Sequence, residues 1–284
     1  MINIDAYFDD ATNTVTYLVE ETTTKTAVLI DPVLDYEPHR ASLNATSTDR
    51  ILAEAKAREL TLTWVLDTHA HADHLSAADY VRDRLGARIA IGAKITQVQT
   101  LFGPVFHADD VGAKGAVFDA LLEDGDEIAF GATTIRVMHT PGHTPACVTF
   151  LIDDAAFVGD TLFMPDYGTA RADFPGGDAR TLYRSIQKIL SLPPDTRIFV
   201  GHDYLPPARD AAAWESTVAE QRRSNIHLQD QDEDAFVAMR DARDATLTAP
   251  RLILPSLQVN IRGGALPPAE SDGHTYLKLP LNRI

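Results

Sequence analysis

The sequence is poor in cysteine and in positive charge, and each shortage excludes a class of protein. Its 284 residues include one cysteine, Cys147, so a framework of intrachain disulfides is excluded. Lys and Arg number 25 against 41 Asp and Glu, a formal net charge of −16. Because such a surface repels phosphate backbones and anionic lipids, we expect neither nucleic acid nor a membrane among its partners.

Long apolar runs are also missing. No stretch approaches the length of a membrane-spanning helix, and residues 1–5 have neither the basic nor the apolar region of a secretory signal. Together with the lone cysteine, which we expect to be buried and inert, these features favour a cytoplasmic location. The 45% of apolar residues suits one large globular domain, or one domain with an appendage.

Strand-like and helix-like segments alternate in the first half of the chain. Residues 2–8 and 14–20 predict a hairpin about Asn13, and residues 27–30, 62–66 and 89–91 predict buried strands. Helices are expected over 49–60, capped by Thr48, and over 75–86, ended by Gly86. Residues 92–125 are irregular and Gly-rich, which predicts a loop that overhangs a site.

The second half continues in the same style as far as residue 205. It predicts strands over residues 127–130, 133–139, 147–152, 155–158 and 196–200, and one helix over residues 178–191. We therefore expect an α/β main domain over 1–205, with two mixed sheets covered by outer helices. An extension over 206–284 is expected to pack on it, with helices over 211–224 and 232–245 and a Pro-rich tail that is a candidate homodimer contact.

One stretch carries the densest chemistry. Residues 65–74 read Val-Leu-Asp-Thr-His-Ala-His-Ala-Asp-His, so an apolar run is followed by three imidazoles and a carboxylate. In an extended segment, side chains two apart point the same way, so His69 and His71 can converge on one point. Asp73 and His74 lie where the chain turns into the next helix. Imidazole and carboxylate together are ligands for zinc, iron or manganese.

Four predicted strand ends carry the candidate ligands, and most are flanked by Gly or Pro. In chain order the candidates are His69, His71, Asp73 and His74, then His143, then Asp160, then His202. Sites of this kind form where strand ends meet loops on a rigid scaffold. The histidines without such a pattern are interpreted as ordinary surface or loop residues: His39, His107, His227 and His274.

This order of ligands resembles the metallo-β-lactamase superfamily, whose signature is His-x-His-x-Asp-His, a later His, an Asp and a final His. All seven positions are filled, and the resemblance covers about residues 1–205. It implies an αββα sandwich with a metal at one edge.

Longer runs resemble one branch, the bacterial persulfide dioxygenases (sulfur dioxygenases). They are residues 139–150, 159–174, 202–204 and 257–262, which include Gly-Thr-Ala-Arg-Ala-Asp-Phe at 168–174 and Leu-Gln-Val-Asn-Ile-Arg at the end. The resemblance implies one Fe(II) held by His69, His143 and Asp160. The substrates would be glutathione persulfide and O₂, and the products sulfite and glutathione.

The same resemblance assigns roles around that iron. Four residues would form a second shell that orients the ligands and any bound water: His71, Asp73, His74 and His202. Arg171 would grip a glutathione carboxylate, Asp173 would hold Arg171, and Tyr204 would donate a hydrogen bond to the tripeptide. The alternatives are a surface ion pair for Arg171 and Asp173, and a packed aromatic for Tyr204.

The chief alternative function is a dinuclear zinc hydrolase resembling glyoxalase II. One zinc would be bound by His69, His71 and His143, the other by Asp73, His74 and His202, with Asp160 bridging. A shared hydroxide would then attack a glutathione thioester. The Arg171 motif and the absence of a basic run in the tail weigh against this reading. A lactonase is a weaker option, a non-catalytic scaffold would have lost ligands, and the net charge opposes a nuclease.

Overall fold

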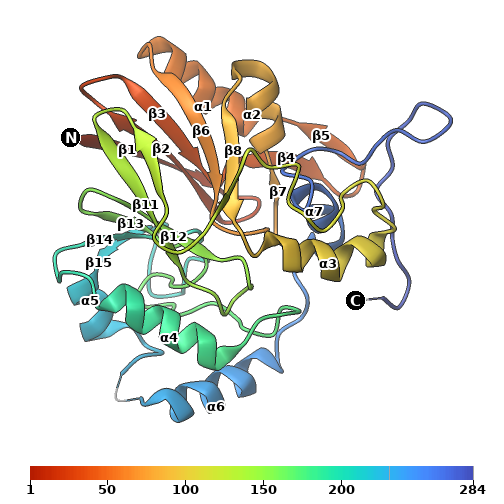
Figure 1. Ribbon diagram of the computed structural model, residues 1–284. Helices are drawn as coiled ribbons and strands as arrows, with labels where there is room; N and C mark the ends of the chain where they lie inside the picture. The colour runs from red at the N-terminus through yellow and green to blue at the C-terminus, as the bar shows by residue number, and fades with distance from the viewer. Residues whose placement is uncertain (230, 284) are drawn as a thin grey trace.

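Two six-stranded sheets face each other in the computed structural model, and helices cover the outer face of each (Figure 1). The structure describes residues 1–229 and 231–283. The helices α1 (Thr46–Ala57) and α2 (Ala78–Leu85) lie over the first sheet. The helices α4 (Ala179–Leu190), α5 (Val218–Ser224) and α6 (Glu233–Asp244) lie over the second. The αββα sandwich expected from the sequence is confirmed.

The first sheet has the order β1-β2-β3-β6-β8-β9, and the second runs from β10 to β15 in chain order. The bounds of the first are β1 (Ile2–Asp9), β2 (Thr14–Glu21), β3 (Thr26–Ile30), β6 (Thr61–Asp67), β8 (Arg88–Gly92) and β9 (Ala120–Leu122). Those of the second are β10 (Glu127–Phe130), β11 (Thr133–His139), β12 (Val148–Ile152), β13 (Ala155–Phe157), β14 (Arg197–Phe199) and β15 (Glu215–Thr217). A small sheet joins β5 (Ser42–Asn44), β4 (Val33–Glu37) and β7 (Leu75–Ser76).

Alternation along β3 and β6 explains why these strands are apolar on both faces. Ala27 and Leu29 pack under the outer helices, whereas Val28 and Ile30 pack between the two sheets. Because successive side chains of a strand point to opposite faces, one short run serves two cores. The candidate ligands follow the carboxyl ends of four strands of these two sheets: β6, β11, β13 and β14.

The first hairpin forms as predicted, with Asp9 opposite Thr14 and Asn13 at a φ of 58°. Two helix starts differ from expectation. Thr48 does not cap α1, because the helix begins at Thr46 and the Thr48 hydroxyl donates instead to the carbonyl of Val33 at 2.7 Å. Residues 75–76 pair with β4 as strand β7, so α2 begins only at Ala78.

The expected loop over residues 92–125 is wrong. It contains α3 (Ile95–Phe106) and strand β9, and none of its residues lines the cavity described below. Gly103 and Pro104 fall in the last turn of α3, where the missing N–H of proline costs one hydrogen bond. The buried apolar face of the helix outweighs that loss, and it consists of Ile95, Val98, Phe102 and Phe106.

The segment after residue 205 also differs from the prediction. Residues 215–217 form β15 at the edge of the second sheet, and only then does α5 begin, because Thr217 and Glu220 make a capping box. The Pro-rich tail contains a buried helix, α7 (Ile253–Asn260). The helix expected over 232–245 forms as α6, and the side chain of Asp232 caps it. The division at residue 205 stays a prediction.

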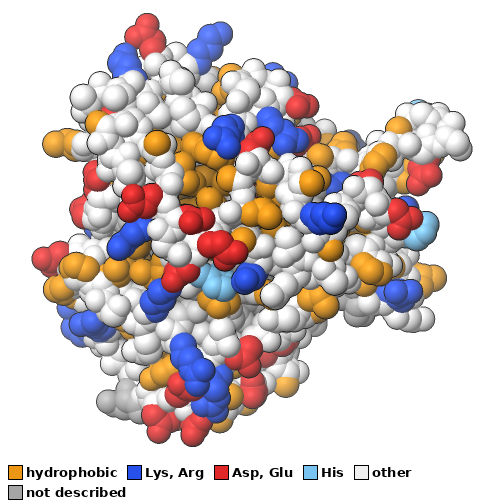
Figure 2. Space-filling model, viewed as in Figure 1, with side chains coloured by type: hydrophobic (Ala, Val, Ile, Leu, Met, Phe, Trp, Pro, Cys, Tyr) orange, Lys and Arg blue, Asp and Glu red, His pale blue; other side chains and the backbone are white. Residues whose placement is uncertain are grey.

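Beyond α7 the chain projects from the body as a loop and then returns, and the backbone N–H of Lys278 donates to Gln258 of α7 at 2.7 Å (Figures 1 and 2). On the face seen in Figure 2, acidic side chains are scattered among basic ones. Among the described residues, none of the helices has the length and apolar character needed to cross a membrane.

Candidate metal centre and cavity

The turn after β6 places three buried imidazoles side by side. The strand ends at Asp67, and residues 68–74 belong to no strand, so the extended segment assumed for His69 and His71 does not form. The ring of His71 nevertheless lies 4.1 Å from that of His69 and 4.1 Å from that of His74, between centroids. His69 and His71 are therefore neighbours, but their ligand atoms belong to two different clusters.

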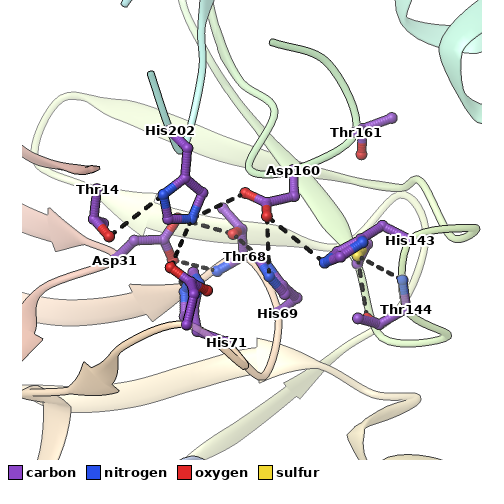
Figure 3. A network of polar contacts seen from close by, with 12 residues as sticks. Thr14, Asp31, Thr68, His69, His71, His143, Thr144, Asp160, Thr161 and His202 are labelled. Carbon is purple, nitrogen blue, oxygen red and sulfur yellow. Dashed lines mark hydrogen bonds and ion pairs between the residues drawn. The ribbon is translucent and has the colours of Figure 1, made fainter. Parts of the chain in front are cut away.

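The first cluster consists of His69, His143 and Asp160. Oδ2 of Asp160 lies 3.8 Å from Nε2 of His69 and 3.6 Å from Nε2 of His143 (Figure 3). These separations are too long for hydrogen bonds. Ligands that share one ion at about 2.1 Å stand roughly 3 to 3.5 Å apart, so the cluster is close to the size that a metal requires.

The second cluster consists of His71, Asp73, His74 and His202. Nε2 of His202 lies 3.2 Å from Oδ2 of Asp73 and 3.4 Å from Oδ1 of Asp160. Asp160 thus turns one oxygen to each cluster (Figure 3). All seven ligands expected from the sequence are brought together at one edge of the sandwich.

His143 is presented by a tight turn between β11 and β12 that packs on the start of α4. Gly142 has a φ of 133°, and a Cβ there would lie 2.3 Å from the Cα of Leu182. Only glycine fits this approach.

Burial raises the pKa of the nearby Cys147 thiol to about 12, so the thiol is inert, as expected.

The donor atoms fit a cation. Within the described residues, five buried polar atoms of the clusters have no hydrogen-bond partner: Nε2 of His69, His74 and His202, Nδ1 of His71 and Oδ1 of Asp160. Buried polar groups normally have hydrogen-bond partners. A bound ion explains why several buried atoms without partners converge on one region. Burial also lowers the pKa of His69 and of His71 well below the usual value, which keeps both imidazoles neutral and able to ligate.

The outer nitrogens of the imidazoles are fixed by protein groups. Nδ1 of His143 donates to the backbone carbonyl of Arg171 at 2.8 Å, so the lone pair of His143 must be on Nε2. Nε2 of His71 lies 3.0 Å from Oδ1 of Asp31, which leaves Nδ1 of His71 for the second cluster. Asp31, which the sequence analysis missed, also accepts the backbone N–H of Thr68 at 2.7 Å.

Asn260, at the end of α7, holds the backbone of the same turn. Its amide donates to the carbonyls of His71 and His74 at 2.7 and 2.8 Å, and its oxygen accepts the N–H of Ser76 at 2.8 Å. The side chain is buried, and its partners lie more than 180 positions earlier in the chain. Asn260 belongs to the Leu-Gln-Val-Asn-Ile-Arg run, whose structural reason is thereby explained.

The clusters open into a cavity of about 410 Å³, a volume typical of sites for small ligands. Asp73, His143 and Asp160 line its metal end. An aromatic wall completes it, formed by Phe163, Tyr167 and Tyr204.

Arg171, Asp173 and Tyr204 lie where the sequence analysis expected them. Asp173 accepts two hydrogen bonds from Arg171, at 2.6 Å from Nε and 2.8 Å from Nη2, and the carbonyl of Thr248 accepts a third at 2.7 Å. A guanidinium has five N–H donors, so two of them stay available to a ligand. Tyr204 stacks on His202, with ring centroids 5.6 Å apart. Both Arg171 and Tyr204 line the cavity, whereas Asp173 supports Arg171 from behind.

The extension also lines the cavity, and it includes two arginines that were not predicted from the sequence, Arg243 and Arg251. They lie eight positions apart, Arg243 in the helix predicted over 232–245 and Arg251 in the Pro-rich tail, and no local pattern linked either to the site. They do not form a run, so the absence of a basic run noted in the sequence stands. Because they still bring positive charge to the cavity, that absence weighs less against a glyoxalase II-like enzyme.

His227 is not an ordinary surface residue, contrary to expectation. It is buried, and its Nδ1 accepts the backbone N–H of Thr169 at 3.0 Å. On the same loop, Asp244 of α6 accepts the N–H of Ala172 at 2.8 Å, and Arg240 donates to the carbonyl of Thr169 at 3.1 Å. The segment that presents Arg171 and bonds His143 is therefore held by buried groups of the extension.

His227 makes stability depend on pH in a stated direction. Burial and the neighbouring guanidinium of Arg240 lower its pKa from 6.5 to about 4. Between these values the unfolded chain binds a proton that the folded protein refuses, so this residue makes the free energy of unfolding fall by about 1.4 kcal/mol per pH unit on acidification. In His227→Asn, urea titrations should show a loss of that slope. His39→Asn is the exposed control, and an unchanged slope in His227→Asn would contradict the assignment.

Removing the Asn260 amide should loosen the metal end selectively. We expect Asn260→Ala to lower the free energy of unfolding by about 3 kcal/mol, because it leaves buried backbone groups unsatisfied. It should also release metal more readily in competition with a chelator. Gln258→Ala is the matched control: Gln258 is equally buried on α7, but its amide bonds Leu254 and Lys278. Equal metal retention in the two variants would remove Asn260 from the support of the site.

Comparison with known proteins agrees with this architecture. The profile of the Metallo-beta-lactamase superfamily matches residues 9–202. A "probable metallo-hydrolase" of Burkholderia pseudomallei is 52% identical over 100% of both chains. "Glyoxylase B2" of Dictyostelium discoideum is 46% identical over 94% of this chain and 92% of that protein. The mitochondrial "Persulfide dioxygenase ETHE1" of Homo sapiens is 35% identical over 78% of this chain and 74% of that protein.

Among solved structures, the crystal structure of ETHE1 from Myxococcus xanthus superposes with a TM-score of 0.75 at 30% identity. The superposition covers 93% of this chain and 100% of the Myxococcus xanthus chain. Its match therefore extends beyond the family profile into the segment that contributes Asn260, Arg243 and Arg251. By its profile, its relatives and its seven ligands, this chain belongs to the metallo-β-lactamase superfamily.

Proposed function

We propose that the protein is a persulfide dioxygenase that uses one Fe(II) to oxidise glutathione persulfide to sulfite and glutathione. The observation that carries the proposal is the compact set of two imidazoles and one carboxylate, His69, His143 and Asp160, at the metal end of the cavity. Two-His-one-carboxylate sets with open positions are typical of non-haem iron oxygenases. The likeness to the human persulfide dioxygenase supports the same reading.

When bound, Fe(II) supplies open positions for dioxygen and the outer sulfur of the persulfide. The outer sulfur is oxidised as dioxygen is reduced, and one water completes the sulfite while glutathione leaves with a proton on its sulfur. The chain's own residues bind and orient the reactants. Arg171, braced by Asp173, keeps two N–H groups for a carboxylate of the substrate. The ring of Tyr204 closes the wall beside His202.

A dinuclear hydrolase is the second candidate, and specific observations favour it. Asp160 turns one oxygen towards each ligand cluster, as a bridging carboxylate does. The names of the relatives from Burkholderia pseudomallei and Dictyostelium discoideum point the same way. In that case a hydroxide shared by two zinc ions would attack a glutathione thioester.

Oxygen uptake separates the two candidates. The protein is purified without oxygen, loaded with ferrous iron and placed in an oxygen-electrode cell. We expect uptake to begin when glutathione persulfide is added, with sulfite formed in equal amount, and glutathione alone is the control. Flat traces together with rapid cleavage of S-lactoylglutathione by the zinc-loaded protein would establish the hydrolase instead.

Metal content of two variants tests which histidine is a ligand of the proposed iron. His69→Ala should lose iron, since it removes one of three ligands. His71→Ala should retain nearly one iron per chain, because the available nitrogen of His71 belongs to the other cluster. Both are measured by elemental analysis after gel filtration. Equal loss in the two variants would argue for a two-metal arrangement.

A further inference from the structure

Two arginines outside the ligand motifs line the cavity from the side of the extension. Arg243 lies in the last turn of α6, and Arg251 lies just before α7. Both are exposed to solvent. Arg171 reaches the same cavity from the segment that follows β13. Three arginines from two separate parts of the chain therefore line one cavity.

The guanidinium groups of Arg243 and Arg251 have no partner within the part of the chain that the structure describes. In residues 1–229 and 231–283, the acidic side chains form ion pairs with many arginines, such as Arg240 with Asp244 and Arg262 with Asp110. Over the same residues, the guanidinium groups of Arg243 and Arg251 have neither an ion pair nor a hydrogen bond. Two unpaired arginines that line the same cavity as Arg171 suit an anionic ligand.

The arrangement of the cavity indicates where charge sits on that ligand. Its metal end is lined by Asp73, His143 and Asp160, which suits a group that binds a metal and repels a free carboxylate. The cations are contributed by other segments of the lining. A ligand that matches this pattern has a metal-binding group separate from its carboxylates. A peptide thiol such as glutathione meets this requirement, because its sulfur lies between two terminal carboxylates.

We propose that Arg243 and Arg251, together with Arg171, form a guanidinium rim that binds the two terminal carboxylates of a peptide thiol while its sulfur reaches the metal end. The inference rests on the proposed function for the identity of the reacting thiol, glutathione persulfide. It adds the basis of selection: persulfides with a single carboxylate, such as cysteine persulfide, engage only part of the rim and are poor substrates.

Binding of glutathione to the metal-loaded protein tests the rim without turnover. Isothermal titration compares wild type with Arg243→Gln and Arg251→Gln, and Arg223→Gln is the control. Arg223 is also exposed and makes the same change of charge on α5, away from the cavity. We expect each rim variant to raise Kd about tenfold, as loss of a charge-assisted hydrogen bond does, while Arg223→Gln stays near wild type.

A ligand change identifies the carboxylate. Glutathione with its glycine carboxylate amidated should bind wild type weakly. If a rim arginine contacts that carboxylate, its replacement by Gln should raise Kd for the amidated peptide by less than a further twofold. The proposal would be overturned if both variants still bound the amidated peptide tenfold more weakly than wild type does. It would also be overturned if both variants bound unmodified glutathione as tightly as wild type. Thermal unfolding of each variant verifies that it is folded.

Kinetics separates failure of the rim from failure of the proposed function. If KM for glutathione persulfide is the same in both rim variants and wild type, the rim is wrong although the enzyme is a dioxygenase. If glutathione binding depends on the rim but no oxygen is consumed, the dioxygenase is wrong and the rim stands.

Discussion

The structure depends on a group of buried polar atoms that the protein leaves unsatisfied. Asp160 stands between two clusters of imidazoles, and its Oδ1 and four imidazole nitrogens have no protein partner in the described chain. Each such atom costs about 1–3 kcal/mol when it stays unpaired in the interior. A bound cation removes this cost, so folding and metal binding are linked in this molecule. Burial that keeps His69 and His71 neutral serves the same end.

The extension holds the centre from two sides. Asn260 fixes the turn of His71 and His74 by three hydrogen bonds, while Asp244 and Arg240 fix the segment around Arg171. The carbonyl of Arg171 in turn fixes the tautomer of His143. Residues that lie far apart in the sequence therefore set the geometry of both ligand clusters and of the cavity. The metal end and the substrate end are parts of one hydrogen-bonded arrangement.

Local patterns predicted what is locally determined. The Asn13 hairpin, the strands before the ligands and all seven ligand positions follow from alternation, turn chemistry and motif spacing. Helix α3 was not predicted because Gly103 and Pro104 are typical of the end of a helix. The helix is stabilised by the packing of its apolar face on the core, which a local sequence window does not show. His227 and Asn260 were missed as supports because their partners lie 58 and more than 180 positions away. Such pairings leave no trace in a local window.

In the proposed enzyme one redox-active ion is bound by His69, His143 and Asp160, with the second cluster as its support. Anomalous diffraction at the iron edge, from crystals of protein that has kept the metal it acquired in the cell, locates this ion. One peak per chain is expected, nearest the first cluster. Two peaks on either side of Asp160, or a signal at the zinc edge alone, would rule out the mononuclear iron site.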